Sequence, residues 1–423
     1  IQRLIQWGIS SNLFSVPTDC NQRDERMGWL ADAHLAAETA MFNFDMAAFY
    51  TNYLRDIRDI QATDGTLTDT VPYRNGRRPA DPAWGAAYPL LTWYMYVYYG
   101  DRRILEQNYA GIKAWADFLT TRAENGVVNY YSYGDWVPVA PTPGALVSTF
   151  YYCWSVDIVA RTALILGKTD EAGAYLELAA SIRKAFHRRF LNPATGSYAN
   201  ASQTASLLPL SLDMAPDDLR PAVLSDLTGD IVYTNNTHLT TGIIGTKYLL
   251  PLLTRVGRSE LAYELATQTS YPSWGYMIEN GATTLWELWQ NKTGPSMNSH
   301  NHPMLGSVGA WFYNALAGIN PDPAAPGFQK IRIEPQVVRD LRWASGSLET
   351  PRGLVASSWS REGDTLRLEV TIPVGSEAEI YVPKLGRTAV TVLESGKPAW
   401  AKEAFQAGAA GLVGAKQTDR AVI

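Results

Sequence analysis

The chain has 423 residues and a formal net charge of -5 at pH 7, and 46% of its residues are hydrophobic, which is typical of a globular protein with a large core. Because no basic run accompanies the negative charge, nucleic acids and anionic membranes are not expected as the main partners. Aromatic residues reach 11% of the sequence, which favours a neutral substrate with surfaces suited to stacking.

Cysteine usage points to no metal or cofactor. Only Cys20 and Cys153 occur, too few for a disulfide framework, and neither has the His/Cys spacing of a metal site. No apolar run reaches membrane-spanning length and no signal peptide is visible, so the localisation stays unknown. The sequence begins at Ile1 in an expected helix, so we expect it to be part of a longer protein. Its oligomeric state is also unknown.

From its start to about residue 319, the sequence repeats apolar residues at helical spacing. Three glycines, Gly100, Gly167 and Gly257, stand where a helix would end in the left-handed conformation. An aromatic, apolar helix precedes such a turn and an amphipathic helix follows it, which is typical of an inner helix covered by an outer one. About a dozen helices in six pairs predict an (α/α)6 barrel over residues 1–320.

Segment 19–32 contains four carboxylates, two arginines and a tryptophan just before an expected helix over 27–42. If the chain is helical from Glu25 onward, Glu25, Trp29 and Asp32 share one face. Carboxylates bind hydroxyls or exchange protons with a glycosidic oxygen, and an indole stacks on a sugar ring, so this face predicts a carbohydrate site. The alternative is a solvated helix start, where acids favour the helix dipole and pair with nearby arginines.

Two polar and aromatic turns, which end in Trp84–Gly85 and in Trp136, stand at the entrances of expected helices. Because loops at one rim of a helical barrel line its cleft, Trp84 and Trp136 are candidate stacking platforms. Packing within the rim is the alternative for each. His238, which precedes a Leu-Thr-Thr-Gly run, is a weaker candidate.

A second unusual run covers residues 279–307 and places Glu287 between Trp286 and Trp289. The loop that follows holds two of the five histidines of the chain, His300 and His302. Desolvation raises the pKa of a carboxylate and a nearby Arg or His opposes this, so the sequence leaves the protonation state of Glu287 open. The alternative is a structural acid whose oxygens are bound by helix-terminal amides.

The character of the sequence changes after the Pro-rich linker 320–327. Alternating apolar and polar residues appear at 366–372 and 378–382, with turn-forming residues between them. We therefore expect a small C-terminal antiparallel β-sandwich domain over residues 328–423.

Segment 19–32 resembles the Asp-Cys-Pro-Gln-Arg-Asp-Glu-Arg-x-Gly-Trp-x-x-Asp signature of the inverting alpha-L-rhamnosidases of glycoside hydrolase family 78. The match departs at Asn21, where the family has Pro, and at Leu30-Ala31, where Thr-Gly is common. Further signatures of the family resemble residues 281–287, 301–307, 134–136 and 238–242. The resemblance covers the helical region and the C-terminal β-domain, and the N-terminal β-sandwich domains of the family have no counterpart in this sequence.

The resemblance implies a hydrolase that releases terminal alpha-L-rhamnose, or a modified rhamnose, from glycosides or saccharides with inversion. Glu25 is implied to be the general acid and Glu287 the general base. Inversion needs two carboxyls roughly 6.5–9.5 Å apart, and residues so far apart in sequence face each other only across a barrel mouth. This chemistry needs no metal. The residues implied to contact the sugar are Asp19, Arg23, Asp24, Trp29, Asp32, Trp84, Trp136 and His302.

Two other functions stay open for the same barrel. A polysaccharide lyase would abstract a proton beside a uronate with a Tyr or His and would need a charge-neutralising group, roles for which Asn298, His300 and His302 are available. A non-catalytic carbohydrate-binding protein would keep the tryptophans but would not need an opposed pair of carboxylates. The natural aglycone or polymer and the linkage are not readable from this sequence.

Overall fold

The computed structural model describes residues 1–407 and 411–423, which form two compact units. The first unit comprises Ile1–Tyr96 and Asp101–Gly309, and the second comprises Val97–Gly100 and Ala310–Ile423. The division falls upstream of the Pro-rich linker 320–327. Of the expected C-terminal domain, residues 408–410 lie outside the described residues.

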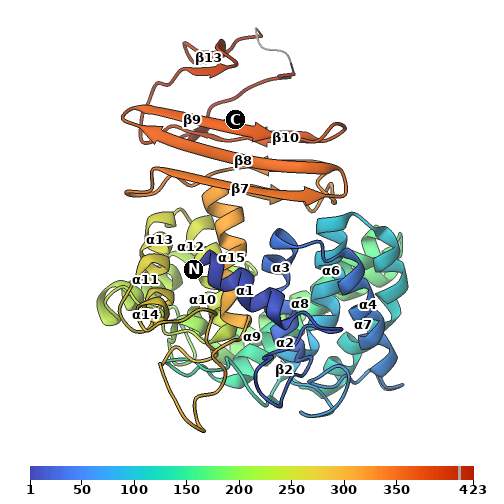
Figure 1. Ribbon diagram of the computed structural model, residues 1–423. Helices are drawn as coiled ribbons and strands as arrows, with labels where there is room; N and C mark the ends of the chain where they lie inside the picture. The colour runs from blue at the N-terminus through green and yellow to red at the C-terminus, as the bar shows by residue number, and fades with distance from the viewer. Residues whose placement is uncertain (408–410) are drawn as a thin grey trace. The chain divides into compact units, whose positions relative to one another are not determined.

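The first unit is built from helices, as expected (Figure 1). In the described part of the chain, no helix combines the length and the apolar character needed to cross a bilayer. The helices that belong to this unit wholly or in large part are α1 (Gln2–Asn12), α2 (Leu30–Leu35), α3 (Ala37–Asn43), α4 (Ala47–Ile60), α5 (Pro82–Gly85), α6 (Ala87–Tyr99), α7 (Arg102–Arg122), α8 (Gly144–Ile165), α9 (Thr169–Phe190), α10 (Gln203–Ser211), α11 (Arg220–Gly229) with its π-helical extension η1 (Asp230–Thr234), α12 (Ile243–Arg255), α13 (Ser259–Thr267) and α14 (Trp274–Glu279).

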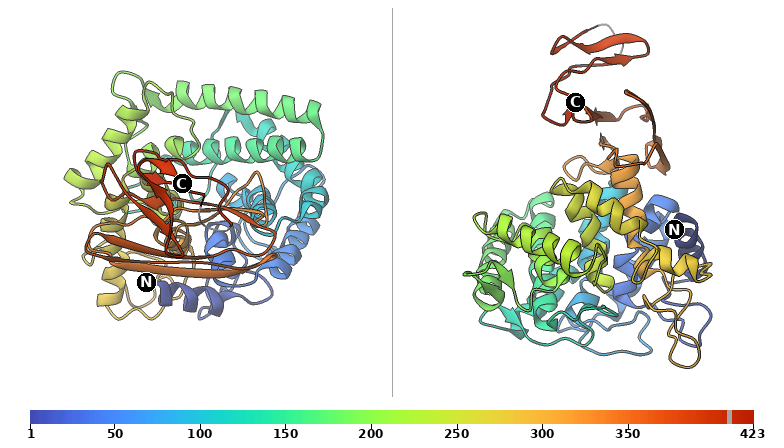
Figure 2. Two further views of the ribbon diagram at one scale, coloured as in Figure 1. Left: turned by 90° about the horizontal axis from the view of Figure 1, so that it is seen from above. Right: turned by 90° about the vertical axis from the view of Figure 1, so that its left-hand side faces the viewer.

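Apolar helices alternate with amphipathic ones in this unit because one set is enclosed and the other covers it. α8 is buried along most of its length, whereas α9 buries one stripe of residues that includes Ala172, Tyr175 and Ile182. The two long helices lie side by side (Figure 2). The glycine between them, Gly167, has a φ of +77° and ends α8 in the left-handed conformation, as the sequence predicted.

The expected helix over 27–42 is wrong at its start. Residues before Leu30 are not helical, and α2 and α3 are separate helices. The reason is a pairing between two extended segments: Leu30 N donates to Asp69 O at 2.9 Å and Val71 N donates to Gly28 O at 2.9 Å. A Cβ at position 28 would lie 2.1 Å from the Val71 oxygen, so only glycine allows this close approach.

Short hairpins and one 3₁₀ helix complete the first unit. The hairpins join β1 (Ala123–Glu124) to β2 (Val127–Val128) and β3 (Leu191–Asn192) to β4 (Ser197–Tyr198). The 3₁₀ helix η2 (Met304–Ser307) follows the loop that holds His300 and His302.

The main segment of the second unit begins within α15 (Val308–Trp311) and includes the π-helical η3 (Phe312–Ala317). The unit is rich in strands, as expected. Its largest sheet is antiparallel, in the order β7-β8-β9. Trp359 of β8 is buried and donates its indole N–H to the Leu316 carbonyl of η3 at 2.7 Å, which ties this sheet to the helix. The strands are β5 (Ile319–Pro321), β6 (Lys330–Ile333), β7 (Trp343–Thr350), β8 (Gly353–Glu362), β9 (Thr365–Thr371), β10 (Glu377–Ile380), β11 (Val382–Pro383), β12 (Val392–Glu394), β13 (Lys397–Ala401), β14 (Ala404–Phe405) and β15 (Ala421–Val422).

One pair of strands departs from the antiparallel expectation. β6 and β10 are parallel, and β5 pairs with the other edge of β6 in the antiparallel direction, so this three-stranded sheet is mixed. The parallel pair is possible because β7, β8 and β9 intervene in the sequence between β6 and β10 and supply a long crossover connection.

Candidate active site

A cleft in the first unit, with a cavity volume of about 320 Å³, collects residues from both ends of that unit's sequence. Small-molecule sites are typically clefts of about 300–1,000 Å³, so this volume suits a small ligand. Every expected site residue except Asp24 lines the cleft. The lining residues are Asp19, Arg23, Glu25, Trp29, Asp32, Trp84, Tyr133, Trp136, Glu287, Asn298, His302 and Met304.

Asp24 is the expected contact that the structure does not bring to the cleft. Its side chain is fully exposed and lies 3.5 Å from Arg26. Arg26 itself has a φ of +49°, so the backbone turns at this point and its neighbours cannot follow the helical spacing assumed from the sequence. Asp24 therefore points to solvent while Arg23 and Glu25 point inward.

Glu25 is held in an irregular loop that Asp19 closes. Asp19 Oδ1 accepts the Met27 N–H at 2.8 Å, and Asp19 N donates to Met27 O at 3.0 Å. Trp29, the residue before α2, donates its indole N–H to Glu25 Oε1 at 2.8 Å. Glu25 and Trp29 thus meet as expected, although through a loop rather than on a helical face.

The environment of Glu25 favours its protonated form. Partial burial raises the pKa of the Glu25 carboxyl above its usual value, and the negative charges of Asp19 and Glu287 add to this. The hydrogen bond from Trp29 and the charge of Arg23 act in the opposite direction, but burial is the largest effect. A carboxyl of this kind is suited to donating a proton near neutral pH.

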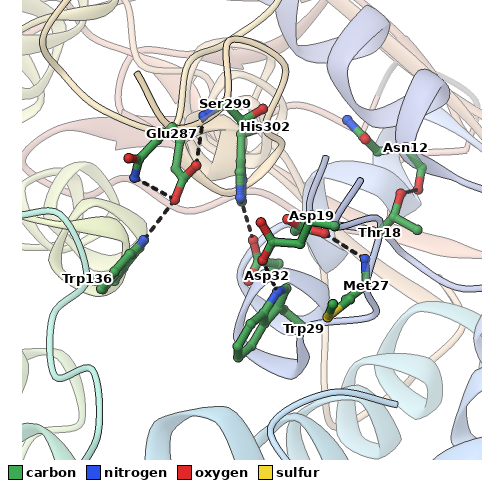
Figure 3. A network of polar contacts seen from close by, with 12 residues as sticks. Asn12, Thr18, Asp19, Met27, Trp29, Asp32, Trp136, Glu287, Ser299 and His302 are labelled. Carbon is green, nitrogen blue, oxygen red and sulfur yellow. Dashed lines mark hydrogen bonds and ion pairs between the residues drawn. The ribbon is translucent and has the colours of Figure 1, made fainter. Parts of the chain in front are cut away.

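Glu287 is held by four donors, two on each carboxylate oxygen. Oε1 accepts from Trp136 Nε1 at 3.2 Å and from Asn298 Nδ2 at 3.0 Å. Oε2 accepts from Ser299 N at 2.9 Å and from Arg23 Nη1 at 3.4 Å. Figure 3 shows Trp136 and Ser299 on either side of Glu287. All four partners donate to the carboxylate, so Glu287 is placed as a hydrogen-bond acceptor, which is the role that a base needs.

One guanidinium joins the two carboxylates. Arg23 Nη2 lies 3.2 Å from Glu25 Oε2, and Arg23 Nη1 lies 3.4 Å from Glu287 Oε2. Because both nitrogens belong to one planar group, the two bridged oxygens are at most about 9 Å apart, a limit that admits the roughly 6.5–9.5 Å range of inverting glycosidases. Glu25 and Glu287 therefore face the same cavity from segments 262 positions apart.

Asp32 and His302 form a buried pair at the floor of the cleft, 3.3 Å apart (Figure 3). Burial, together with the charges of Asp19 and Glu287, raises the pKa of the Asp32 carboxyl well above its usual range. Burial lowers the pKa of His302 to about 4, so its ring is neutral near pH 7. Asp32 Oδ1 faces His302 Nε2 in this pair, whereas the buried His302 Nδ1 has no hydrogen-bond partner among the described residues.

Tyr133 is the centre of an aromatic wall. Its ring lies 4.4 Å from that of Trp84, 5.7 Å from that of Trp29 and 6.0 Å from that of Trp136, measured between centroids. Its hydroxyl donates to Asp69 Oδ2 at 3.0 Å, which fixes the ring. The three tryptophans, which were predicted as site residues from three separate segments, therefore all contact the same tyrosine.

Buried acids hold the loops that carry this wall. Asp81 Oδ2 accepts the N–H groups of Ser132 and Tyr133 at 2.6 and 3.0 Å. Asp135 accepts four bonds, which come from Gly242 N, Ile244 N, Gly245 N and the Thr204 hydroxyl. Such satisfied carboxylates position the neighbouring aromatic residues and do not face the cavity.

Tyr133, Asn298 and Met304 line the cleft without having been expected there as sugar contacts. A signal was present for two of them. Tyr133 directly precedes the Gly-Asp-Trp run, and Asn298 opens the loop of the two histidines, where it takes a φ of +57° that Asn tolerates better than most residues. Nothing in the sequence pointed to Met304, since a single methionine is usually interpreted as part of the hydrophobic core.

Two of the quoted histidines do not reach the cavity. His238 Nε2 lies 2.8 Å from the Ser270 hydroxyl, and His238 Nδ1 lies 2.8 Å from the Asn236 carbonyl, so the ring fixes its own loop. His300 stacks on Trp286 with ring centroids 4.6 Å apart. His300, which the sequence left available as the base of a lyase, therefore packs against Trp286 and does not line the cleft.

Ligand atoms of Asp19, Cys20 and Glu25 lie within 4.8 Å of one another, which is close enough to hold a metal ion. A thiol binds a metal as the thiolate, but burial strongly raises the pKa of the Cys20 thiol and so favours its protonated form. Asp19 is already used by Met27 and Glu25 by Trp29. The donor set does not fit a resident metal.

Models of known protein families match nearly the whole chain. Residues 1–316 match the bacterial alpha-L-rhamnosidase 6 hairpin glycosidase domain. Residues 318–397 match the bacterial alpha-L-rhamnosidase C-terminal domain. These matches confirm the predicted fold class, a six-hairpin helical barrel followed by a small C-terminal β-domain.

Curated relatives give the same result. Alpha-L-rhamnosidases of Alteromonas sp. (strain LOR) and of Streptomyces avermitilis are each 36% identical to 90% of this chain. The chain spans only 43% and 37% of their respective lengths.

Solved structures extend the likeness to the backbone. The alpha-L-rhamnosidase of Dictyoglumus thermophilum is 42% identical with a TM-score of 0.93, over 100% of this chain and 47% of that one. The Streptomyces avermitilis alpha-L-rhamnosidase complexed with L-rhamnose is 36% identical with a TM-score of 0.86, over 90% of this chain and 37% of that one.

Proposed function

Because the chain belongs to the bacterial alpha-L-rhamnosidase family, we propose that its cleft hydrolyses terminal alpha-L-rhamnosides, or those of a modified rhamnose, with inversion. Glu25 is the general acid and Glu287 the general base. The observation that carries this assignment is the unequal environment of two carboxyls facing one cavity. Burial raises the pKa of Glu25, whereas Glu287 accepts four hydrogen bonds.

The reaction follows from these two environments. Protonated Glu25 transfers its proton to the glycosidic oxygen as the bond from that oxygen to the anomeric carbon breaks. Ionised Glu287 takes a proton from water as the water oxygen attacks the anomeric carbon from the opposite face. The products are the free sugar and the alcohol of the leaving group, and exchange with solvent resets both carboxyls.

The remaining residues bind the sugar. Asp19, Asp32 and His302 offer polar atoms at the floor of the cleft, and the wall of Trp29, Trp84, Tyr133 and Trp136 offers apolar surface for the faces of the ring and its methyl group. The structure of the Streptomyces avermitilis relative contains L-rhamnose, which supports a rhamnose-containing substrate here. A polysaccharide lyase or a purely binding role is not favoured by these relatives.

The test is release of 4-nitrophenol from its alpha-L-rhamnoside, with proton NMR to identify the anomer formed first. We expect turnover with the beta-anomer appearing first, and none above background in the double variant Glu25→Gln/Glu287→Gln. Appearance of the alpha-anomer first would refute inversion. No turnover by a folded wild-type chain that also fails to bind L-rhamnose would refute the substrate assignment.

A further inference from the structure

Arg23 contacts both carboxylates, and each contact opposes one half of the proposed reaction. A cation beside Glu25 favours its ionised form, whereas a general acid must carry a proton. On the other side, a carboxylate offers about four lone-pair positions, and Glu287 already accepts four hydrogen bonds. The attacking water needs one of those positions.

Arg23 is held to Glu287 less firmly than Ser299 and Trp136 are. Ser299 is fixed, because Glu287 N donates to its carbonyl at 2.8 Å while Ser299 N donates back to the side chain. Trp136 is fixed by the buried Asp135 beside it. Arg23 makes the longest of the four contacts, at 3.4 Å, and its side chain is 40% exposed, so the ion pair is partly screened by solvent.

We propose, on the basis of the rhamnosidase function above, that Arg23 is a positioning residue that acts as a latch on both carboxylates. Its guanidinium binds Glu25 and Glu287. Arrival of the sugar draws the guanidinium onto the sugar hydroxyls, so Glu25 holds its proton more firmly and Glu287 gains a free position for the attacking water. One side-chain movement prepares the acid and the base together.

The charges around Glu25 set the direction of this effect. Asp19, Glu287 and Asp32 lie near it and are acidic, and His302 is neutral near pH 7. The Cys20 thiol beside Glu25 is kept protonated by burial, which raises its pKa. Trp29 and Arg23 are the groups that stabilise the ionised form of Glu25. Since the indole N–H has no net charge, Arg23 is the cation of this pair, and loss of its guanidinium raises the pKa of Glu25 further.

The pH dependence of an alkyl alpha-L-rhamnoside, a substrate with a poor leaving group, tests the latch. kcat/KM reports the free enzyme and kcat the complex, and both fall with rising pH as Glu25 loses its proton. We expect the basic limb of kcat to lie at a pH higher than that of kcat/KM by about half a unit or more. Coincident limbs in the wild-type chain would overturn the proposal without touching the rhamnosidase assignment.

The variant Arg23→Met should move the basic limb of kcat/KM upward to meet that of kcat. The matched control is Arg103→Met, which removes the same charge from an exposed pair at the start of α7. It should keep the gap of the wild type, that is, the pH difference between the basic limbs of kcat and kcat/KM. If Arg23 only binds hydroxyls, KM rises and the gap is unchanged, which overturns the latch. The wild-type comparison needs no variant, so a misfolded Arg23→Met chain would not prevent the decision.

A second measurement does not depend on turnover. Glutamate ¹³C-carboxyl signals are titrated with and without L-rhamnose, and Glu25 is the signal that Glu25→Gln lacks. A rise of the Glu25 pKa on sugar binding supports the latch, and an unchanged or lowered value overturns it. Failure to bind L-rhamnose overturns the latch together with the substrate assignment, whereas binding with no change in Glu25 overturns the latch alone.

Discussion

Two opposite sides of the cleft, which carry Glu25 and Glu287 and are called its carboxyl walls below, differ in how many hydrogen bonds hold the glutamate. Glu287 accepts two hydrogen bonds on each oxygen, and one of its donors is a backbone N–H. Glu25 lies on an irregular loop and meets only the indole of Trp29 and the shared guanidinium of Arg23. Four donors therefore fix the carboxylate of Glu287, whereas two groups contact that of Glu25.

The comparison teaches how the proposed acid and base of one cleft can be the same residue type and differ only in the number of donors around them. Both side chains are glutamates, and both are partly or largely removed from water. The difference in role therefore arises from neighbours rather than from residue type.

The largest expected effect is on the rate of hydrolysis. It should depend on the leaving group of the substrate for a change at Glu25 but not for a change at Glu287. Glu25→Gln should cost roughly 10²–10⁴-fold in kcat/KM on an alkyl alpha-L-rhamnoside and much less on the 4-nitrophenyl glycoside, whose leaving group needs little protonation. Glu287→Gln should cost a similar factor on both substrates. Steady-state kinetics with the two substrates measure the difference.

The control is Asp24→Asn, which alters the exposed acid next to Glu25 and should leave both rates near wild type. Equal losses for Glu25→Gln on both substrates would contradict its role as the acid. In that case the assignment of the two walls would have to be exchanged or abandoned.

A smaller effect should follow from removing one indole donor from each wall. Trp29→Phe deletes the bond to Glu25, and because that bond lowers the Glu25 pKa, the basic limb of kcat/KM should move to higher pH. Trp136→Phe leaves Glu287 with three donors, so kcat should fall by about 2- to 10-fold with the basic limb unmoved. A shift of that limb in Trp136→Phe alone would reverse the comparison.

The smallest effect concerns stability at the floor between the walls. The raised pKa of Asp32 means that its contribution to stability is complete below its ordinary pKa of 3.8 and is lost as the pH rises through the folded-state value. At pH 7 the native state therefore carries a cost. Asp32→Asn should raise the free energy of unfolding at pH 7 by about 1 kcal/mol, although sugar binding weakens.

Chemical denaturation at pH 7 and near pH 4 measures this effect, and the gain should shrink toward the lower pH. Asp24→Asn, at an exposed site, should change stability little at either pH. An equal loss of stability at both pH values in Asp32→Asn would show that the carboxyl is needed for packing.

Helical periodicity was sufficient to predict the class of the fold, because apolar spacing and left-handed glycines are local properties. Gly167, for example, ends α8 with a φ of +77°, as expected. The segment before Leu30 was not predictable in this way. Its conformation depends on pairing with residues 69–71, and no local pattern reveals a partner 40 positions away.

The candidate site was predictable to the extent that its residues belong to recognisable runs. Asp19, Glu25 and Glu287 reach the cleft as the signatures implied, and their catalytic and binding roles remain predictions. The direction of Asp24 was not predictable, because alternation in an irregular loop has no fixed period. Tyr133 was missed for the same reason: it becomes central only through contacts with three separate segments.

Arg23 and Glu287 also show where the helical ring is completed. Gln22 donates to Ser299 Oγ at 2.7 Å, and Asn12 donates to Asn301 Oδ1 at 2.9 Å. Hydrogen bonds therefore join the beginning of the unit, at α1 and the loop after it, to the loop that holds Ser299 and Asn301. The cleft therefore lies on the seam of the barrel. The cleft forms only when the two ends of the unit meet, whereas helices form without that closure. Turnover, if the proposed function holds, therefore reports closure of the ring, and circular dichroism reports only that helices have formed.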